Sequence, residues 1–371
     1  MKHCAFLIAV LVATVLLNGC DKSAPPEQKT SEPQLAKTFL PDGLLTTLSA
    51  NTFQHTTELL HLSHQLHIAT TGFLEQPSPE KLKDAQNTYN LLLSQWAQSL
   101  PYIYMTALTT QGAPLVNRIE KLPMLPGYLD ELPDYPYSGL VHDIMLPIQP
   151  ESLKRLHTLD NDEQVIFGLS AIEFLLFDHF QSDHYQQFLI QNELPEEEAS
   201  QEILIEQLPN NRRRSLLKLQ VEQLVEDTSE LHKRWQLPNG EDTKKFNALI
   251  SKNLNLTLSK SYQKATWLVL DALNSIQEKP LLLGRAHFSR AETELLNVGI
   301  ETLTGYHQNL SSIWAVFPQP EKEEFTAVLN SLSELIQQYQ QEPSNSLLLE
   351  LASNRCNQLL ELSHDLVFQP E

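Results

Sequence analysis

Apolar side chains recur at helical spacing over long stretches of this chain, and that periodicity constrains the fold more than any other feature. In the range 214–235 the charged residues stand apart from one apolar stripe, which is formed by Leu217, Val221, Leu224, Leu231 and Trp235. A β-sandwich or a β-barrel needs many tight turns, whereas only 11 of the 371 residues are glycine. We therefore predict an all-α protein.

Local signals mark where some of these helices begin and end. Ser78 followed by Pro79 is typical of a helix start, with serine as the N-cap and proline at the first helical position. We expect this helix to end before Pro101. Asp160 and Glu163 stand three residues apart, which predicts a capping box ahead of the apolar run that follows.

Two breaks interrupt the helical pattern. The range 111–150 contains seven prolines and three glycines, a density that precludes a long helix. A loop of this length either acts as a lid or cleft wall or covers and shields the helices, and both interpretations stay open. The second break spans 193–211. We place a boundary there and predict two packed helical bundles, residues 41–200 with the proline-rich loop and residues 201–371.

The pattern of the first forty residues predicts export from the cytoplasm and attachment to a membrane by lipid. A basic start, an apolar run over 4–17 and a small residue before Cys20 form a secretory signal that is too short to span a bilayer. The range 17–20 (Leu-Asn-Gly-Cys) resembles the bacterial lipobox, in which lipid is attached to the cysteine. We predict a signal peptide over residues 1–19 and a lipidated, flexible tether over residues 20–40. An ordinary secretory signal with a chance cysteine is the alternative.

Lipid on Cys20 would hold the protein at the periplasmic face of the cell envelope, and the sequence leaves inner and outer membrane undecided. The chain carries 26 Lys and Arg against 46 Asp and Glu, a net charge of −20. Such a charge repels nucleic acid, so nucleic acid is not an expected partner. After cleavage and lipidation of Cys20, Cys356 has no cysteine left to pair with, and we expect it to be a small core residue.

One apolar segment carries the clearest candidate for chemistry. The range 165–177 is apolar on all faces except at Glu173, so we expect a buried helix with Gly168 packed closely inside it. Ser170 lies three residues before Glu173 and would project from the same face. A buried carboxylate needs a partner, or its pKa rises. Either Ser170 and Glu173 form a buried functional site, or Glu173 is a structural carboxylate bound to an arginine or to backbone amides of the proline-rich loop.

The segment that begins at Gly168 resembles the signature of the imelysin family, also called peptidase family M75. That signature has glycine, then histidine two residues later, glutamate three residues after the histidine, and an aromatic-Leu-Leu-aromatic run. Ser170 stands where the family has histidine. The range 118–123, with Arg118 and Glu120, resembles a second family block, and the resemblance extends over most of the chain.

This resemblance implies two packed helical bundles with the signature facing a cleft between them, and an envelope location beside iron-uptake or haem-related proteins. It also implies a metal site, which would place iron or zinc at Glu173, although the hydroxyl of Ser170 is a poor ligand for either ion. If the two halves meet at the signature, His287 or Arg118 could reach Glu173. The candidate site residues are Gly168, Ser170, Glu173, Arg118, Glu120 and His287, with Glu173 as the candidate metal ligand.

Two other clusters allow more than one interpretation. An early helix holds four histidines, which are His55, His61, His64 and His67. His61, His64 and His67 are spaced three residues apart, so adjacent pairs of these three can share a helix side and, with Glu58, could bind a transition metal; the alternative is a polar helix face. The arginine run 212–214 predicts either a solvated helix start or a patch of ion pairs between the bundles, in preference to a nucleic-acid site.

Three functions are compatible with these features. The first is a non-enzymatic, imelysin-like lipoprotein that binds a metal, a small ligand or a partner protein in iron uptake or homeostasis. The second is a metallopeptidase of the M75 type, or another hydrolase, that uses Glu173, although the chain has no H-E-x-x-H helix. The third is a structural or interaction lipoprotein without a ligand.

Overall fold

The computed structural model describes residues 43–132, 134–177, 183–194, 203–249, 251–277, 292–310 and 319–364. These residues are mainly α-helical, and the β-pairing found among them is an isolated bridge between Leu132 and Tyr135. The prediction of an all-α protein is therefore confirmed. All of the described residues belong to one compact unit. The predicted signal peptide, Cys20 and the tether lie outside the described residues.

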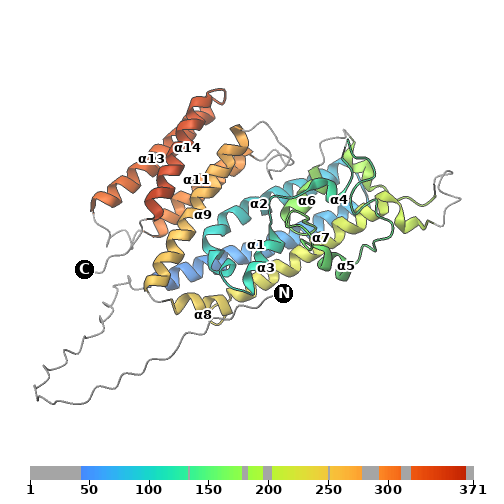
Figure 1. Cartoon of the computed structure of the whole chain (residues 1–371), viewed down its shortest axis with the longest axis horizontal. Helices are drawn as coiled ribbons and strands as arrows, with labels where there is room; N and C mark the ends of the chain where they lie inside the picture. The colour runs from blue at the N-terminus through green and yellow to red at the C-terminus, as the bar shows by residue number, and fades with distance from the viewer. Residues whose placement is uncertain are drawn as a thin grey trace, which may run out of the picture. The chain divides into compact units, whose positions relative to one another are not determined.

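Three long helices, α1 (Leu44–Glu75), α2 (Pro79–Ala107) and α7 (Pro209–Arg234), pack together around one apolar core (Figure 1). Helices α1 and α2 form a hairpin, and α7 packs along α1. Their facing stripes bury large apolar side chains, among them Leu59, Leu66, Trp96, Leu217, Leu224 and Trp235. The apolar stripe predicted over 214–235 thus faces a core, and burying each such side chain contributes about 1.5–3 kcal/mol.

Shorter elements pack around this core. They are α3 (Gly112–Ile119), α4 (Pro126–Leu129), α5 (Pro150–Leu156), α6 (Leu169–Phe177), α8 (Glu241–Asn247) and the 3-10 turns η1 (His184–Phe188) and η2 (Ile205–Gln207). Helix α3 and helix α6 both pack against α2 and α7. Because they share these neighbours, the two segments that resemble the imelysin family come together in space.

The C-terminal part of the described chain consists of α9 (Ser251–Gln277), α11 (Glu292–Asn309), α13 (Gln319–Gln341) and α14 (Ser346–His364). Helix α9 packs against α11 and α14, α13 packs against α14, and both α9 and α11 pack against α2. Cys356 of α14 is fully buried, as predicted, and burial raises the pKa of its thiol to about 12. None of the described helices combines the length and the apolar character that crossing a membrane requires.

The predicted boundary near position 200 falls between η1 and η2, and residues 195–202 are outside the described ranges. Helix α7 comes after that position in the chain and packs on α1, which precedes it. The division into residues 41–200 and residues 201–371 stays a prediction.

Helix α2 begins as predicted but continues further. The Ser78 side chain accepts a hydrogen bond from a backbone N–H of the first turn at 3.3 Å, with Pro79 at the first helical position. The expected end before Pro101 is wrong, because α2 continues through that proline. Tertiary packing outweighs the lost backbone hydrogen bond, since Trp96 and Ile103 on either side of the proline are 1% exposed.

The capping box expected at Asp160 and Glu163 is also wrong. These residues lie in a turn, where Asn161 Oδ1 accepts a hydrogen bond from the Glu163 N–H at 3.0 Å. The Glu163 carbonyl in turn accepts one from the Leu125 N–H at 2.9 Å. The turn is thereby fixed to the chain that follows α3, and α6 begins only at Leu169.

Candidate functional site

Helix α6 is enclosed on all sides, as its apolar sequence predicted. Every residue of α6 is buried, with Ser170 2% and Glu173 0% exposed. The Tyr89 hydroxyl of α2 donates a hydrogen bond to the Leu169 carbonyl at 3.0 Å and fixes the start of the helix. The family signature therefore lies in the interior of the protein, where it acts on neighbouring elements.

Gly168 lies directly before α6, with a φ of +103° that favours glycine. A Cβ atom there would lie 2.6 Å from the Arg118 carbonyl oxygen and 2.7 Å from the Ile119 carbonyl oxygen. The predicted close packing is confirmed, but the predicted position of the glycine inside the helix is wrong. Gly168 lets the end of α3 and the start of α6 touch backbone to backbone.

A histidine outside the signature stabilises the backbone directly before Gly168. His157 Nδ1 accepts hydrogen bonds from the backbone N–H groups of Ile166 at 3.1 Å and Phe167 at 3.3 Å, which requires a neutral ring. Burial, together with the nearby Arg118 and Lys121 charges, lowers the pKa of His157 to about 4. The sequence does not signal this role, because the partners of the histidine are backbone groups nine and ten residues later.

Ser170 uses its hydroxyl on the backbone, since Oγ donates to the Lys121 carbonyl at 3.1 Å. This hydrogen bond fixes the segment after α3. Within the described ranges, no group of three or more His, Cys, Asp or Glu side chains is placed to hold a metal ion. The described residues around Glu173 therefore do not fit the iron or zinc site that the resemblance implies, and His287 lies outside them.

Arg118 forms a bidentate ion pair with Asp227 of α7. Its Nη2 and Nε atoms lie 2.7 Å and 3.1 Å from Asp227 Oδ1. Asp227 is 2% exposed, and burial raises the pKa of its carboxyl group although the guanidinium opposes this shift. Arg118 therefore joins α3 to α7, and this pair engages the arginine that was expected to reach Glu173.

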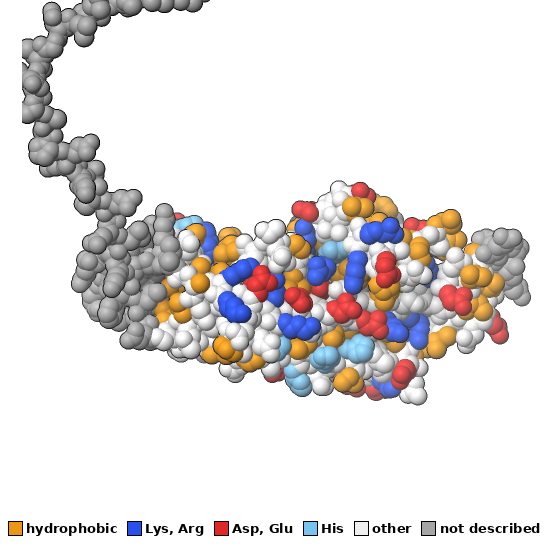
Figure 2. Space-filling view, turned by 90° about the horizontal axis from the view of Figure 1, so that it is seen from below, with side chains coloured by type: hydrophobic (Ala, Val, Ile, Leu, Met, Phe, Trp, Pro, Cys, Tyr) orange, Lys and Arg blue, Asp and Glu red, His pale blue; other side chains and the backbone are white. Residues whose placement is uncertain are grey.

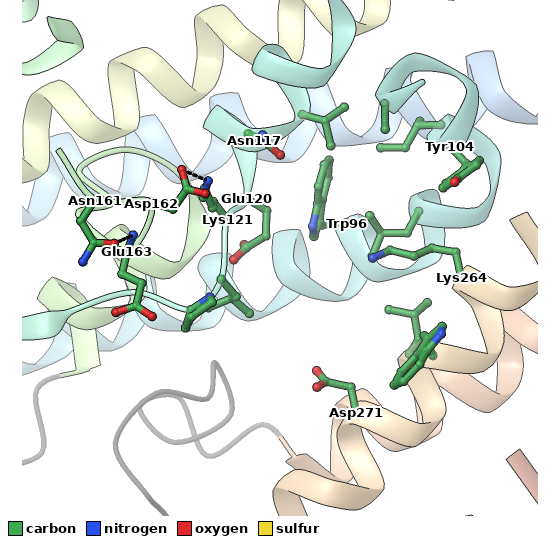
Figure 3. A pocket seen from close by; sticks show the side chains of 18 residues that line it. Trp96, Tyr104, Asn117, Glu120, Lys121, Asn161, Asp162, Glu163, Lys264 and Asp271 are labelled. Carbon is green, nitrogen blue, oxygen red and sulfur yellow. Dashed lines mark hydrogen bonds and ion pairs between the residues drawn. The ribbon is translucent and has the colours of Figure 1, made fainter. Parts of the chain in front are cut away.

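A cleft of about 760 Å³ opens beside this supported segment. It lies between α2, the segment from the end of α3 to Pro123, the turn at 161–163 and α9 (Figure 3). Its aromatic and charged lining includes Trp96, Tyr104, Glu120, Lys121, Lys264 and Trp267. Glu120 of the predicted site thus lines a cleft, whereas Gly168 and Ser170 act on the wall of that cleft from behind.

The walls of the cleft differ in exposure. Trp96 of α2 is 1% exposed, and its indole N–H has no hydrogen-bond acceptor among the described residues. Trp267 of α9 is 51% exposed. Lys121 pairs with the exposed Asp162 at 2.9 Å, a contact that water weakens. Burial raises the pKa of Tyr104, so the cleft presents a neutral phenol and an indole donor beside its charges.

The sequence analysis did not identify Lys264 and Trp267 as site residues. Both belong to α9, which has the pattern of an ordinary amphipathic helix, and the wall that faces them comes much earlier in the chain. A large aromatic side chain outside the apolar stripe is the one signal that points to Trp267.

Two residues of the arginine run 212–214 are buried, and Arg214 is partly exposed. Arg212 is 4% exposed and donates to three backbone carbonyl groups of the proline-rich loop, at 2.6–2.8 Å. Arg213 is 2% exposed and pairs with Asp130 of the same loop, with Nη2 at 2.9 Å from Oδ1. The predicted solvated helix start is wrong, and an ion pair is confirmed for Arg213. The proline-rich loop is thus a covering element along α7 as well as a cleft wall at its start.

The histidines of α1 have separate surroundings. His61 and His64 are exposed, and Figure 2 shows histidine side chains gathered on one face of the molecule. The part of the chain that the structure describes contains no three-ligand group there, so the metal site predicted with Glu58 has no support in it. His55 is enclosed instead: its ring stacks on Tyr102 with centroids 4.4 Å apart, and burial lowers its pKa to about 4.

Comparisons with known proteins agree with this fold. The family model described as Imelysin (Peptidase_M75) matches residues 53–347. Among solved structures, the chain is similar to a protein from Parabacteroides distasonis ATCC 8503 described as an iron-regulated protein A precursor, with 13% sequence identity and a TM-score of 0.58. The likeness covers 90% of this chain and 96% of that one, and at this identity it concerns the fold alone. No curated protein matches the sequence.

Proposed function

The chain belongs to the imelysin family, and on that basis we propose that it is a non-enzymatic binding protein of the bacterial cell envelope. Its cleft between α2, α3 and α9 takes a small ligand connected with iron uptake or homeostasis. One observation carries this proposal: the family segment 118–123 forms a wall of the cleft, and α6 supports that wall from behind through Gly168 and Ser170. The family segments therefore shape a cleft.

The arrangement favours binding over peptide hydrolysis. A metallopeptidase needs three protein ligands around the metal, an open coordination position and a water molecule that a base can activate. The described residues near Glu173 do not provide such a set, and Glu173 is 0% exposed. Ser170 donates to a backbone carbonyl and Arg118 is bound to Asp227, so both of these side chains hold the structure together.

An envelope location is part of the proposal. Lipid on Cys20 and the tether over residues 20–40 would attach the folded part to a membrane surface. The similar solved structure is described as iron-regulated, which supports an iron-related role here. Iron-uptake or haem-related envelope proteins are the partners that we propose with this role. Cys20→Ala is expected to move the protein from the membrane fraction to the soluble fraction. An unchanged membrane fraction would contradict the lipid anchor.

Binding is tested on the full-length lipoprotein in detergent, by titration calorimetry with ferric citrate and with ferric complexes of aromatic chelators. Glu120→Gln removes a charge from the cleft lining, whereas Glu222→Gln removes one from the surface of α7 as a matched control. We expect Glu120→Gln to change the affinity for ferric complexes about tenfold relative to wild type and the control to bind like wild type. Equal affinity of the two variants would contradict the proposal. Chelator-sensitive hydrolysis of a denatured protein, abolished by Glu173→Gln, would favour the metallopeptidase instead.

A further inference from the structure

The α2 wall of the cleft contains a hydrogen-bond donor without an acceptor. Trp96 is 1% exposed, its Nε1 atom is buried, and no residue of the described ranges accepts its proton. Figure 3 shows this nitrogen at the edge of the indole that faces the cavity. A buried donor left unpaired costs about 1–3 kcal/mol, and such donors in native structures are satisfied by water or a ligand. Trp96 therefore marks a point where a bound molecule would place an acceptor atom.

A cation reaches the same part of the cleft from the α9 wall. Figure 3 shows the Lys264 side chain extended into the cavity, with its ammonium group on the side that faces Trp96. Lys264 and Trp96 are two N–H donors on opposite walls of the cleft, and the oxygen atoms of a carboxylate accept hydrogen bonds from both kinds of donor.

An aromatic surface stands beside these donors. Trp267 follows Lys264 by three residues on α9, so both side chains lie on the same side of the helix, and both line the cleft. Trp267 is 51% exposed, although tryptophan is on average a well-buried residue. A ring stacked on this indole would bury that surface. The volume of about 760 Å³ is in the range of pockets that enclose ligands larger than a single ring.

We propose that the cleft binds a planar aromatic carboxylate, with the carboxylate between Trp96 and Lys264 and the ring stacked on Trp267. The inference rests on the proposed function, because it names the class of ligand for that same cleft. Glu120 and Asp271 also line the cleft and would accept hydrogen bonds from hydroxyl or amino groups on the ring. A ligand with positive charge alone would bind these two carboxylates and have no use for Lys264.

The ligand class is tested with small probes of similar size on the full-length lipoprotein in detergent, by titration calorimetry. 2-Naphthoate is planar and anionic, 2-naphthylmethylammonium is planar and cationic, and decahydronaphthalene-2-carboxylate is anionic without an aromatic ring. We expect 2-naphthoate to bind about tenfold more tightly than either of the others. Tighter binding of the ammonium compound would overturn the proposal in favour of a cation site. Equal binding of the saturated acid would overturn the stacking on Trp267.

Variants separate the contributions of the side chains. Lys264→Met and Trp96→Phe are each expected to weaken 2-naphthoate binding about tenfold, since each removes one donor and keeps most of the side-chain bulk. Trp267→Leu should remove the preference for the aromatic acid over the saturated one. Lys260→Met, about one turn earlier on α9 and outside the cleft lining, is the matched control and should bind like wild type.

The outcomes distinguish this inference from the proposed function. Thermal unfolding shows whether each variant is folded, and equal affinities of folded Lys264→Met and Lys260→Met would overturn the anion site. If ferric complexes bind in a manner that depends on Glu120 while 2-naphthoate does not bind, the ligand class is wrong and the proposed function stands. If neither kind of ligand binds, both proposals fail.

Discussion

The proline-rich loop and the cleft handle buried polar groups in opposite ways. In the loop, three carbonyl groups accept hydrogen bonds from Arg212, and Asp130 pairs with Arg213. In the cleft, Trp96 keeps an N–H group for which the described residues offer no acceptor, and Trp267 is half exposed. Satisfied polar groups stabilise a fold, whereas polar groups left over in a concave surface are available to a ligand. On this contrast we propose that the loop serves stability and the cleft serves binding.

Removing the ion pair between Arg213 and Asp130 of the proline-rich loop is expected to give the largest loss of stability. Arg213→Met leaves the Asp130 carboxylate, which is 5% exposed, without its guanidinium partner, and breaking a buried pair costs about 3–5 kcal/mol. Chemical denaturation should show this loss of unfolding free energy. Arg155→Met removes an exposed arginine and should change the value by less than about 0.5 kcal/mol. If Arg213→Met folded with unchanged stability but lost ligand binding in the cleft, the loop would serve binding, contrary to our proposal.

Lowering the pH is expected to reduce the stability of the protein through His157, which binds the backbone directly before α6. His157 has a pKa of about 4 in the folded protein, against an ordinary value of 6.5. Between these values the unfolded chain binds a proton that the folded protein does not, so stability falls as the pH drops from 6.5 towards 4. The full shift corresponds to at most about 3 kcal/mol, which residual exposure of the ring reduces.

Urea denaturation at pH 7 and pH 4.5 measures this dependence. His55 and His307 have their pKa lowered to about 4 as well, and burial also lowers the pKa of His232, so the wild type should respond through several histidines. In His157→Asn, the slope of the unfolding free energy against pH should decrease by the equivalent of about one proton. His61→Asn, at an exposed position of α1, is the control and should keep the wild-type slope. A slope that is the same in both variants would show that His157 does not hold the start of α6 in its neutral form.

What the sequence predicted well depends on neighbours that are close in the chain. The helical periodicity and the N-cap at Ser78 are local signals, and both are confirmed. The features that it missed are decided by distant partners: the carbonyl groups that bind Arg212 are 69 to 72 residues away, and Asp130 is 83 residues from Arg213. Pro101 was mispredicted for the same reason, because packing against other helices carries α2 through it.

The candidate site shows the same limit. Gly168 and the segment 118–123 could be predicted, since a glycine in an apolar run implies close packing and the family resemblance includes both. The role of Ser170 could not, because the acceptor of its hydroxyl is the carbonyl of Lys121, 49 residues earlier. Lys264 could not either, since helical spacing does not tell which exposed positions will face another element.

Adding a methyl group at Gly168 tests the wall of the cleft with a smaller effect. The positive φ alone costs a side chain about 1–3 kcal/mol, and in Gly168→Ala the new carbon would also meet two carbonyl oxygens at 2.6 and 2.7 Å. Gly43→Ala is the matched control, with a φ of +84° and nothing within 4 Å of the added carbon. We expect Gly168→Ala to be the less stable variant in thermal and chemical unfolding. Equal losses would show that the close approach to α3 is not needed.

Ser170→Ala is expected to have the smallest effect on stability, and it tests most directly whether α6 serves the cleft or only the fold. It removes one hydrogen bond to the Lys121 carbonyl, which is worth about 1 kcal/mol. Ser215→Ala is the control, because its hydroxyl bonds a carbonyl on the exposed side of α7. If α6 shapes the cleft, 2-naphthoate affinity should fall several-fold in Ser170→Ala, since Glu120 and Lys121 belong to the released segment, and stay constant in the control. A loss of stability with unchanged affinity would instead place this serine with the loop arginines, as part of the fold alone.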